Sequence, residues 1–220
     1  GAARRHIGRG PHGNDRPRLG VAQEMREGFA AVGANPLLAQ LIVAAIVAYA
    51  MTGPMQILLP KLAREVLGLS ELQRGGYLGL MALTLIAGGV TALLLSKHLH
   101  HGAAIFVGTV TASLLFASLS HWSSAAASAA ALGGMGLLGG MVISFVIAGI
   151  QGQAPEALRG RIMSIYSIIS QVVPATSGVA AGALVRATGV TQAILYAGVG
   201  LAGLALLAAA LMPQLRRVAR

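Results

Sequence analysis

The chain has 220 residues, of which 55% are hydrophobic and only 10% are charged, and its net charge is +10. Soluble domains carry about 25% charged residues, so this composition excludes a disordered polar chain and weighs strongly against a soluble enzyme. Cysteine is absent, which excludes a disulfide framework and a thiolate metal site. The composition is typical of a helical protein that crosses a membrane several times.

The beginning of the chain is basic and then amphipathic. Residues 1–20 are rich in Arg, Gly and Pro and are predicted to form a flexible cytoplasmic linker. Residues 21–36 are predicted to form a helix on the membrane surface, because apolar side chains recur on one helical face and Asn35-Pro36 ends the pattern. The chain begins with Gly and has no signal-peptide core, so we expect a fragment or a chain that lacks its beginning.

Six apolar stretches without charged residues follow, each close to the length of about 20 residues that a bilayer core requires. They predict an all-α membrane bundle over residues 37–215, with spans at 37–60, 77–96, 103–119, 129–152, 162–185 and 191–212. Residues 216–220 are predicted to form a basic cytoplasmic tail.

The orientation of the bundle follows from its basic residues. An even number of spans places both termini on one side, and all basic residues fall on that side except Lys61, Arg64, Arg74 and Arg186. The positive-inside rule therefore predicts that both termini are cytoplasmic. The positive charge is assigned to anionic lipids at this face of the bilayer, and we expect no nucleic-acid partner.

Uncharged polar side chains inside the spans are the candidate lining of a substrate cavity. The candidates are Tyr49, Thr52 and Gln56 in the first span, Ser144 and Gln151 in the fourth, and Ser167 and Gln171 in the fifth. Those of the first and fifth spans recur at helical spacing, and Pro54 and Pro174, which are expected to kink their helices, lie in the same stripes. The alternative is that these groups join neighbouring helices by hydrogen bonds. For the three glutamines, the cost of an unpaired amide in lipid favours the cavity.

No catalytic set, cofactor motif or metal site is recognisable, which argues against an enzyme and against a self-contained ATP-driven pump. The three histidines in residues 97–101 have no accompanying carboxylate and are interpreted as a polar turn. The spans contain no Lys, Arg, Asp or Glu, so any proton-coupling residue is expected outside this chain.

Small residues repeat at spacing four in three places, and we interpret these repeats as helix-packing surfaces. The repeats are Gly75 with Gly79, Gly136 with Gly140, and Gly178 with Gly182.

The polar segment before the fifth span is the candidate cytoplasmic gate. It contains Glu156, near the expected helix start where negative charge is favourable, followed by Arg159 and Arg161. One interpretation is an ordinary basic loop on the cytoplasmic face. The other is a gate whose guanidinium groups pair with acids or with helix carbonyl ends when the pore closes on the inside.

Three segments carry a resemblance to a known family. They are PEALRGRIMSIY at 155–166, EMREGF at 24–29 ahead of Asn35-Pro36-Leu37, and LLP at 58–60 with VLG at 66–68. Over residues 21–215 the chain resembles the major facilitator superfamily, and most closely the branch of the enterobactin exporter and macrolide efflux proteins.

The resemblance implies that the chain forms helices seven to twelve of a twelve-helix transporter, whose missing partner is an amino-terminal half of six helices. It further implies a secondary active, proton-coupled exporter or antiporter in the bacterial inner membrane. Its small-molecule substrate would be an amphipathic or siderophore-like solute that is carried by alternating access.

Two alternatives stay open. The chain could be a non-transporting membrane scaffold, which its start and its lack of membrane-embedded charge favour. It could also be a lysophospholipid flippase, a role that the same family fold serves. Six further spans upstream would remove the main support for a scaffold, and transport of labelled lysophospholipid would identify a flippase.

Overall fold

The structure, a computed structural model, describes residues 21–96 and 101–217, so the predicted linker at 1–20 and most of the histidine-containing turn lie outside the described residues. The described residues form helices and no strands, which confirms the all-α fold class. The helices are α1 (Val21–Ala34), α2 (Pro36–Lys61), α3 (Glu71–Leu95), α4 (His101–Ser118), α5 (Ala125–Gln153), α6 (Arg159–Thr188), α7 (Val190–Leu211) and α8 (Pro213–Arg217). Short turns of other helix types follow α2 and α4 and precede α6, at Leu62–Val66, Leu119–His121 and Glu156–Leu158.

The six helices from α2 to α7 are long and apolar enough to cross a membrane, and each covers one of the predicted spans. Several of them begin earlier than the charge pattern indicates. Helix α3 begins at Glu71 rather than at residue 77, because Ser70 and Gln73 cap each other's backbone N–H groups at its start. Loss of charge marks the part of a helix that fits in lipid, whereas capping decides where the helix begins.

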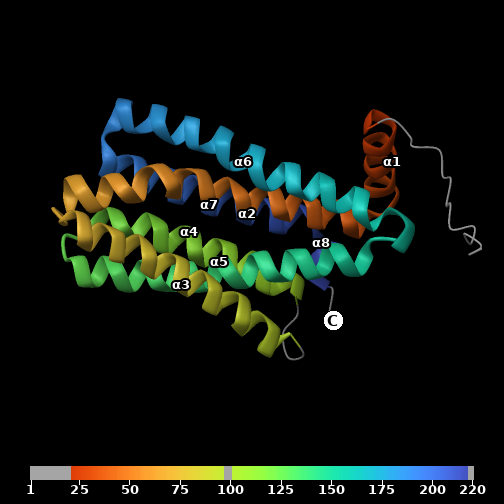
Figure 1. The fold of residues 1–220 in the computed structure, drawn as a ribbon, viewed down its shortest axis with the longest axis horizontal. Coiled ribbons are helices and arrows are strands. Elements are labelled where there is room, and N and C mark those ends of the chain that lie inside the picture. Colours follow the sequence, from red (N-terminus) through yellow and green to blue (C-terminus); the bar gives the residue numbers. More distant parts are fainter. Residues whose placement is uncertain (1–20, 97–100, 218–220) are drawn as a thin grey trace, which may run out of the picture.

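The junction between α1 and α2 is built by Asn35 and Pro36. The Asn35 side chain accepts hydrogen bonds from the backbone N–H groups of Leu37 and Leu38, at 3.1 and 3.2 Å, and Pro36 occupies the first position of α2. Asn35-Pro36 therefore ends α1, as predicted, and also caps the start of α2. Helix α1 lies crosswise to the long helices at one end of the bundle (Figure 1).

The long helices run side by side, with loops alternating between the two ends of the bundle (Figure 1). Helix α3 packs mainly on α5, α2 on α6, and α4 on both α5 and α7. Two apolar clusters form the core. One is centred on Leu38, Phe145 and Ile150, and the other on Leu58, Phe116 and Leu132.

Glycines bring two helix pairs into backbone contact. A Cβ atom added to Gly88 of α3 would lie 2.0 Å from the Leu137 carbonyl oxygen of α5, and one added to Gly140 would lie 2.0 Å from the Leu85 carbonyl oxygen. A Cβ atom at Gly53 of α2 would lie 2.2 Å from a carbonyl oxygen of α6. Only glycine fits at these crossings.

Only some of the predicted glycine repeats pack in this way. Gly136 and Gly140 do lie against α3, as expected. Gly75, Gly79 and Gly182 have open space where a Cβ would be, so their assignment as packing surfaces is wrong within the described residues. Spacing alone does not tell which face of a helix meets a neighbour.

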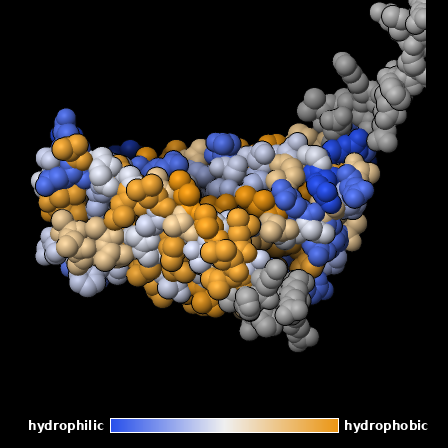
Figure 2. All heavy atoms as spheres, turned by 60° about the horizontal axis from the view of Figure 1, so that its bottom comes forward, coloured by the Kyte–Doolittle hydropathy of each residue, from blue (hydrophilic) through white to orange (hydrophobic). Residues whose placement is uncertain are grey.

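The surface has an apolar band between two more hydrophilic ends (Figure 2). Helix α3 contributes much of the exposed apolar surface, with Leu93 being 74% exposed and Leu83 68% exposed. An apolar belt of this kind is what lipid tails require of a membrane-spanning bundle.

The carboxyl-terminal end of the described chain is fixed to the bundle. The backbone N–H of Leu215 in α8 donates to the side-chain oxygen of Gln40 in α2, at 2.8 Å, and the Leu215 side chain is buried. Helix α8 is therefore attached to the half of α2 that begins at Pro36.

We expect the change Gly88→Ala to lower the free energy of unfolding by about 1–3 kcal/mol, because the added methyl group meets backbone that cannot move away cheaply. Gly79→Ala, on the same helix but with open space around it, is the matched control and should change stability by less than about 1 kcal/mol. Thermal or denaturant unfolding of the detergent-solubilised chain measures both. Equal effects of the two changes would contradict the assigned crossing.

Candidate functional site

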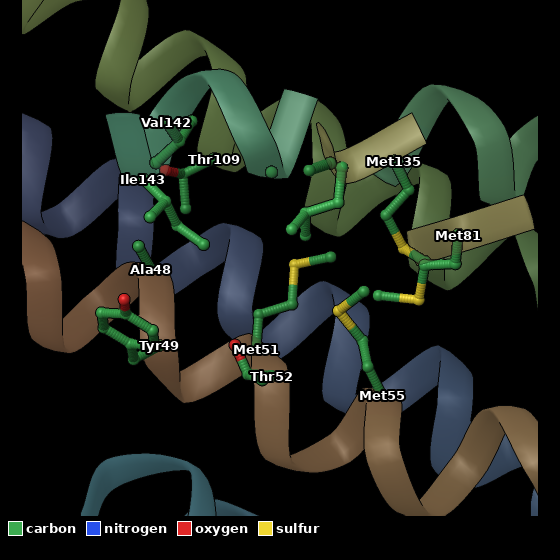
Figure 3. Close-up of a pocket in the computed structure, with 13 residues that line it drawn as sticks. Ala48, Tyr49, Met51, Thr52, Met55, Met81, Thr109, Met135, Val142 and Ile143 are labelled. Carbon is green, nitrogen blue, oxygen red and sulfur yellow. The ribbon is translucent and has the colours of Figure 1, made fainter. Parts of the chain in front are cut away.

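A cavity of about 210 Å³ lies among α2, α3, α4 and α5 and is the candidate functional site (Figure 3). Its wall is mostly apolar, with three hydroxyl-bearing side chains. The lining residues are Ala48, Tyr49, Met51, Thr52, Met55, Met81, Leu85, Thr109, Ala112, Met135, Gly139, Val142 and Ile143. Because none of these side chains is charged, the cavity suits an uncharged group.

The two tyrosines Tyr49 and Tyr166 form a link between α2 and α6 beside this cavity. Their hydroxyl oxygens lie 2.6 Å apart, and their rings meet edge to face with centroids 5.8 Å apart. Tyr49 was predicted from the polar stripe of the first span. Tyr166 was missed as a site residue, because it lies on the buried face of α6, away from Ser167 and Gln171.

The predicted cavity residues do not all share one cavity. Of the seven, Tyr49 and Thr52 line the cavity shown in Figure 3. Gln56 is exposed and lines a second cavity of about 350 Å³ between α2 and α6, together with Pro174 and Arg186. This second cavity opens beside the Gly53 crossing, so it follows the seam between the two helices.

Three of the remaining four candidates are exposed on outer faces of the bundle. Ser167 and Gln171 are exposed on α6, and the Ser167 hydroxyl donates to the Met163 carbonyl at 2.9 Å. Gln151 is exposed near the end of α5. Ser144 is half-buried where α5 passes α3. Within the described bundle, these four polar groups do not meet in a single site.

The two predicted kink positions are buried in the seam between α2 and α6. Pro54 and Pro174 are both buried, and both helices continue in α-helical conformation through them. The Pro174 carbonyl lies directly against Gly53, the residue before Pro54. A bend at either proline stays a prediction.

The candidate gate is connected to the amphipathic helix. The Arg161 guanidinium forms an ion pair with the Glu27 carboxylate of α1, and α1 approaches α6 closely because Gly28 is buried against Ile165. Arg159 is exposed at the start of α6, and Glu156 is exposed in the preceding short turn. Arg161 therefore has an acidic partner in this conformation, and Glu27 is the residue that the sequence interpretation missed.

Histidine and hydroxyl groups elsewhere have structural partners. His101 begins α4 and packs its ring on Phe145, with centroids 5.0 Å apart, so its expected place in a turn is wrong. The hydroxyls of Tyr77 and Ser128 lie 2.6 Å apart in the core.

Across residues 21–96 and 101–217, no group of three His, Cys, Asp or Glu side chains could hold a metal ion.

Comparison with known proteins identifies one family. The family model described as Major Facilitator Superfamily matches residues 4–175. Comparison with curated proteins and with solved structures found no match. The match covers most of the helical bundle and includes the cavity, the tyrosine pair and the Arg161–Glu27 contact.

We expect charge reversal to weaken the contact between α1 and α6. Glu27→Arg or Arg161→Glu alone should loosen this contact, because both side chains then carry the same charge. The double change should restore the contact, because the two side chains again carry opposite charges, with their positions exchanged. The contact is partly exposed, so the coupling energy should be only about 0.2–1 kcal/mol. Because the chain has no cysteine, spin labels on cysteines introduced at Ala30 and Ser164 can report the distance between the helices. A double variant that stays as loose as the single ones would contradict the ion pair.

Proposed function

The chain belongs to the major facilitator superfamily, a family of membrane transporters, and we propose that it forms one six-helix lobe of a secondary active exporter. The proposed substrate is a small amphipathic solute, carried by alternating access between two lobes. The observation that carries this proposal is the coincidence of the family match with six helices that are long and apolar enough to cross a membrane.

The outer faces of the helices support a second lobe as the partner. The exposed surface of α3 is apolar, as lipid requires, with Leu83 and Leu93 turned outward. The exposed surface of α6 is mixed and carries Ser164, Ser167 and Gln171 beside exposed apolar side chains such as Ile168 and Val172. A glutamine facing lipid would be costly, so we assign this side of α6 to a hydrated space between two lobes, the second being an amino-terminal half of six helices.

The Arg161–Glu27 pair supports a gate at the cytoplasmic end. The structure brings α1, the α5–α6 connection and α8 to one end of the bundle (Figure 1), and we propose that this end faces the cytoplasm and anionic lipids of a bacterial inner membrane. Arg159 and Glu156, which are exposed at the same end, are then free to pair with the second lobe when the inner side closes. The proposed driving ion is the proton, with its binding residue outside this chain.

Hydrophilic thiol reagents test the proposed hydrated face. A cysteine at Gln171 should react with a charged, membrane-impermeant thiol reagent that reaches the inter-lobe space, because water enters that space. A cysteine at Ile86, which is 63% exposed on α3, should react at least tenfold more slowly, because lipid excludes the reagent. Both variants start from a chain without cysteine. Similar labelling of the two positions in membranes would contradict the assignment of the two faces.

An accumulation assay tests export itself. Cells that express the chain together with its amino-terminal half should retain less of a fluorescent amphipathic dye than control cells, by about twofold or more. Gln171→Ala should weaken the effect, whereas Ile86→Ala should not, since only Gln171 is assigned to the solute path. Unchanged retention across a broad panel of dyes would count against export.

A further inference from the structure

Methionines are concentrated around the cavity shown in Figure 3. Of the eight methionines in the chain, four line this space, namely Met51 and Met55 of α2, Met81 of α3 and Met135 of α5. Their side chains turn into the same cavity from three helices (Figure 3). Met51 and Met55 are four residues apart, so the α-helix itself places them on one face.

Ordinary core packing does not account for the space between these side chains. A packed core leaves few voids larger than a water molecule, whereas this cavity measures about 210 Å³ and is partly open to the surroundings, with Tyr49, Thr52 and Met81 half-buried in its wall. An apolar cavity of about 150 Å³, engineered into another protein, binds benzene. The cavity therefore has room for one six-membered ring with a small substituent.

The chemistry of the wall favours an uncharged aromatic ring. Thioether sulfur makes favourable contacts with aromatic rings, and the flexible methionine side chain adapts to their shape. None of the lining side chains carries a charge that could pair with an ion, so a charged group would lose its hydration without compensation.

Hydroxyl groups give the cavity a polar end. Tyr49 and Thr109 lie toward one end of the cavity, and Met81 and Met135 lie toward the other (Figure 3). The Thr109 hydroxyl already donates to the Ile105 carbonyl at 2.7 Å. The Tyr49 hydroxyl shares one hydrogen bond with Tyr166 and has further capacity, as does the Thr52 hydroxyl, since each hydroxyl can donate once and accept twice.

We propose that this cavity is a binding subsite for a neutral aromatic ring that carries one hydrogen-bonding substituent, as in a phenol. The ring contacts the thioethers of Met51, Met55, Met81 and Met135, and the substituent bonds to Tyr49 or Thr52. The assignment of this ring to the exported solute rests on the proposed function. Binding itself is a property of this chain alone.

Nuclear magnetic resonance of ¹³C-methyl-methionine tests the subsite in the full chain in detergent micelles. Phenol should shift the ε-methyl signals of the four cavity methionines through its ring current, with single Met→Leu variants assigning each signal. Met141, Met163 and Met212, which belong to the other apolar cluster, are internal controls and should not shift. Cyclohexanol, of similar size but without a π system, should bind about three- to tenfold more weakly, given the usual strength of sulfur–aromatic contacts.

A cavity-filling variant keeps the test independent of folding defects. Gly139 lines the cavity, and a Cβ there would lie 4.0 Å from its nearest neighbour, so Gly139→Val should fill the space and abolish the phenol-induced shifts. Gly200→Val, which is open to the surroundings, should leave them intact. Unchanged control-methionine signals in both variants would show that the fold is kept.

The outcomes separate the subsite from the proposed export. Equal shifts at all methionines, equal affinity for cyclohexanol, or persistence of the shifts in Gly139→Val would overturn the subsite. Selective shifts in a chain that fails the accumulation assay would support the subsite and count against export. Export without selective shifts would leave the proposed function standing and overturn the subsite.

Discussion

Backbone contact between neighbouring helices at glycine is the constraint on which this structure depends. Inside lipid, apolar side chains gain little by leaving one apolar surface for another, so close packing has to hold the helices together. Gly88 and Gly140 let α3 and α5 touch, and Gly53 lets α2 touch α6. The remaining helices, α4 and α7, pack behind these two pairs and complete the bundle.

The cavity of Figure 3 lies where α2 and α4 meet the close pair of α3 and α5. Methionines from α2, α3 and α5 extend into this space without filling it, and the hydroxyls of Tyr49 and Thr52 add polarity to its wall. Residues of types that are common in a packed core therefore line a cavity that can hold a ligand.

The sequence predicts the six spans because absence of charge over about 20 residues is a strong signal in a membrane protein. It also predicts the stop at Asn35-Pro36, whose capping role depends only on neighbouring residues. It does not predict which residue of another helix a given side chain contacts. Several spans are apolar on all sides, so hydropathy does not tell the face that meets lipid from the face that meets another helix.

The candidate site also contains residues that the sequence predicts and contacts that it does not predict. Tyr49 and Thr52 lie on the cavity wall, as the polar stripe predicts, whereas Gln56 of that stripe lies in the seam with α6. The contacts of Tyr49 with Tyr166 and of Arg161 with Glu27 join residues more than a hundred positions apart. A single sequence holds no signal for such long-range pairs, nor for a methionine cluster that is assembled from three helices.

Attachment of the two short terminal helices has a mechanical consequence. Helix α1 is joined to α6 through Glu27 and Arg161, and helix α8 is joined to α2 through Leu215 and Gln40. Helix α1 also continues directly into α2 through Asn35, so it bridges the two helices that cross at Gly53. A change in the angle between α2 and α6 would therefore have to stretch or break the ion pair of α1, and an optical probe on α1 would report it.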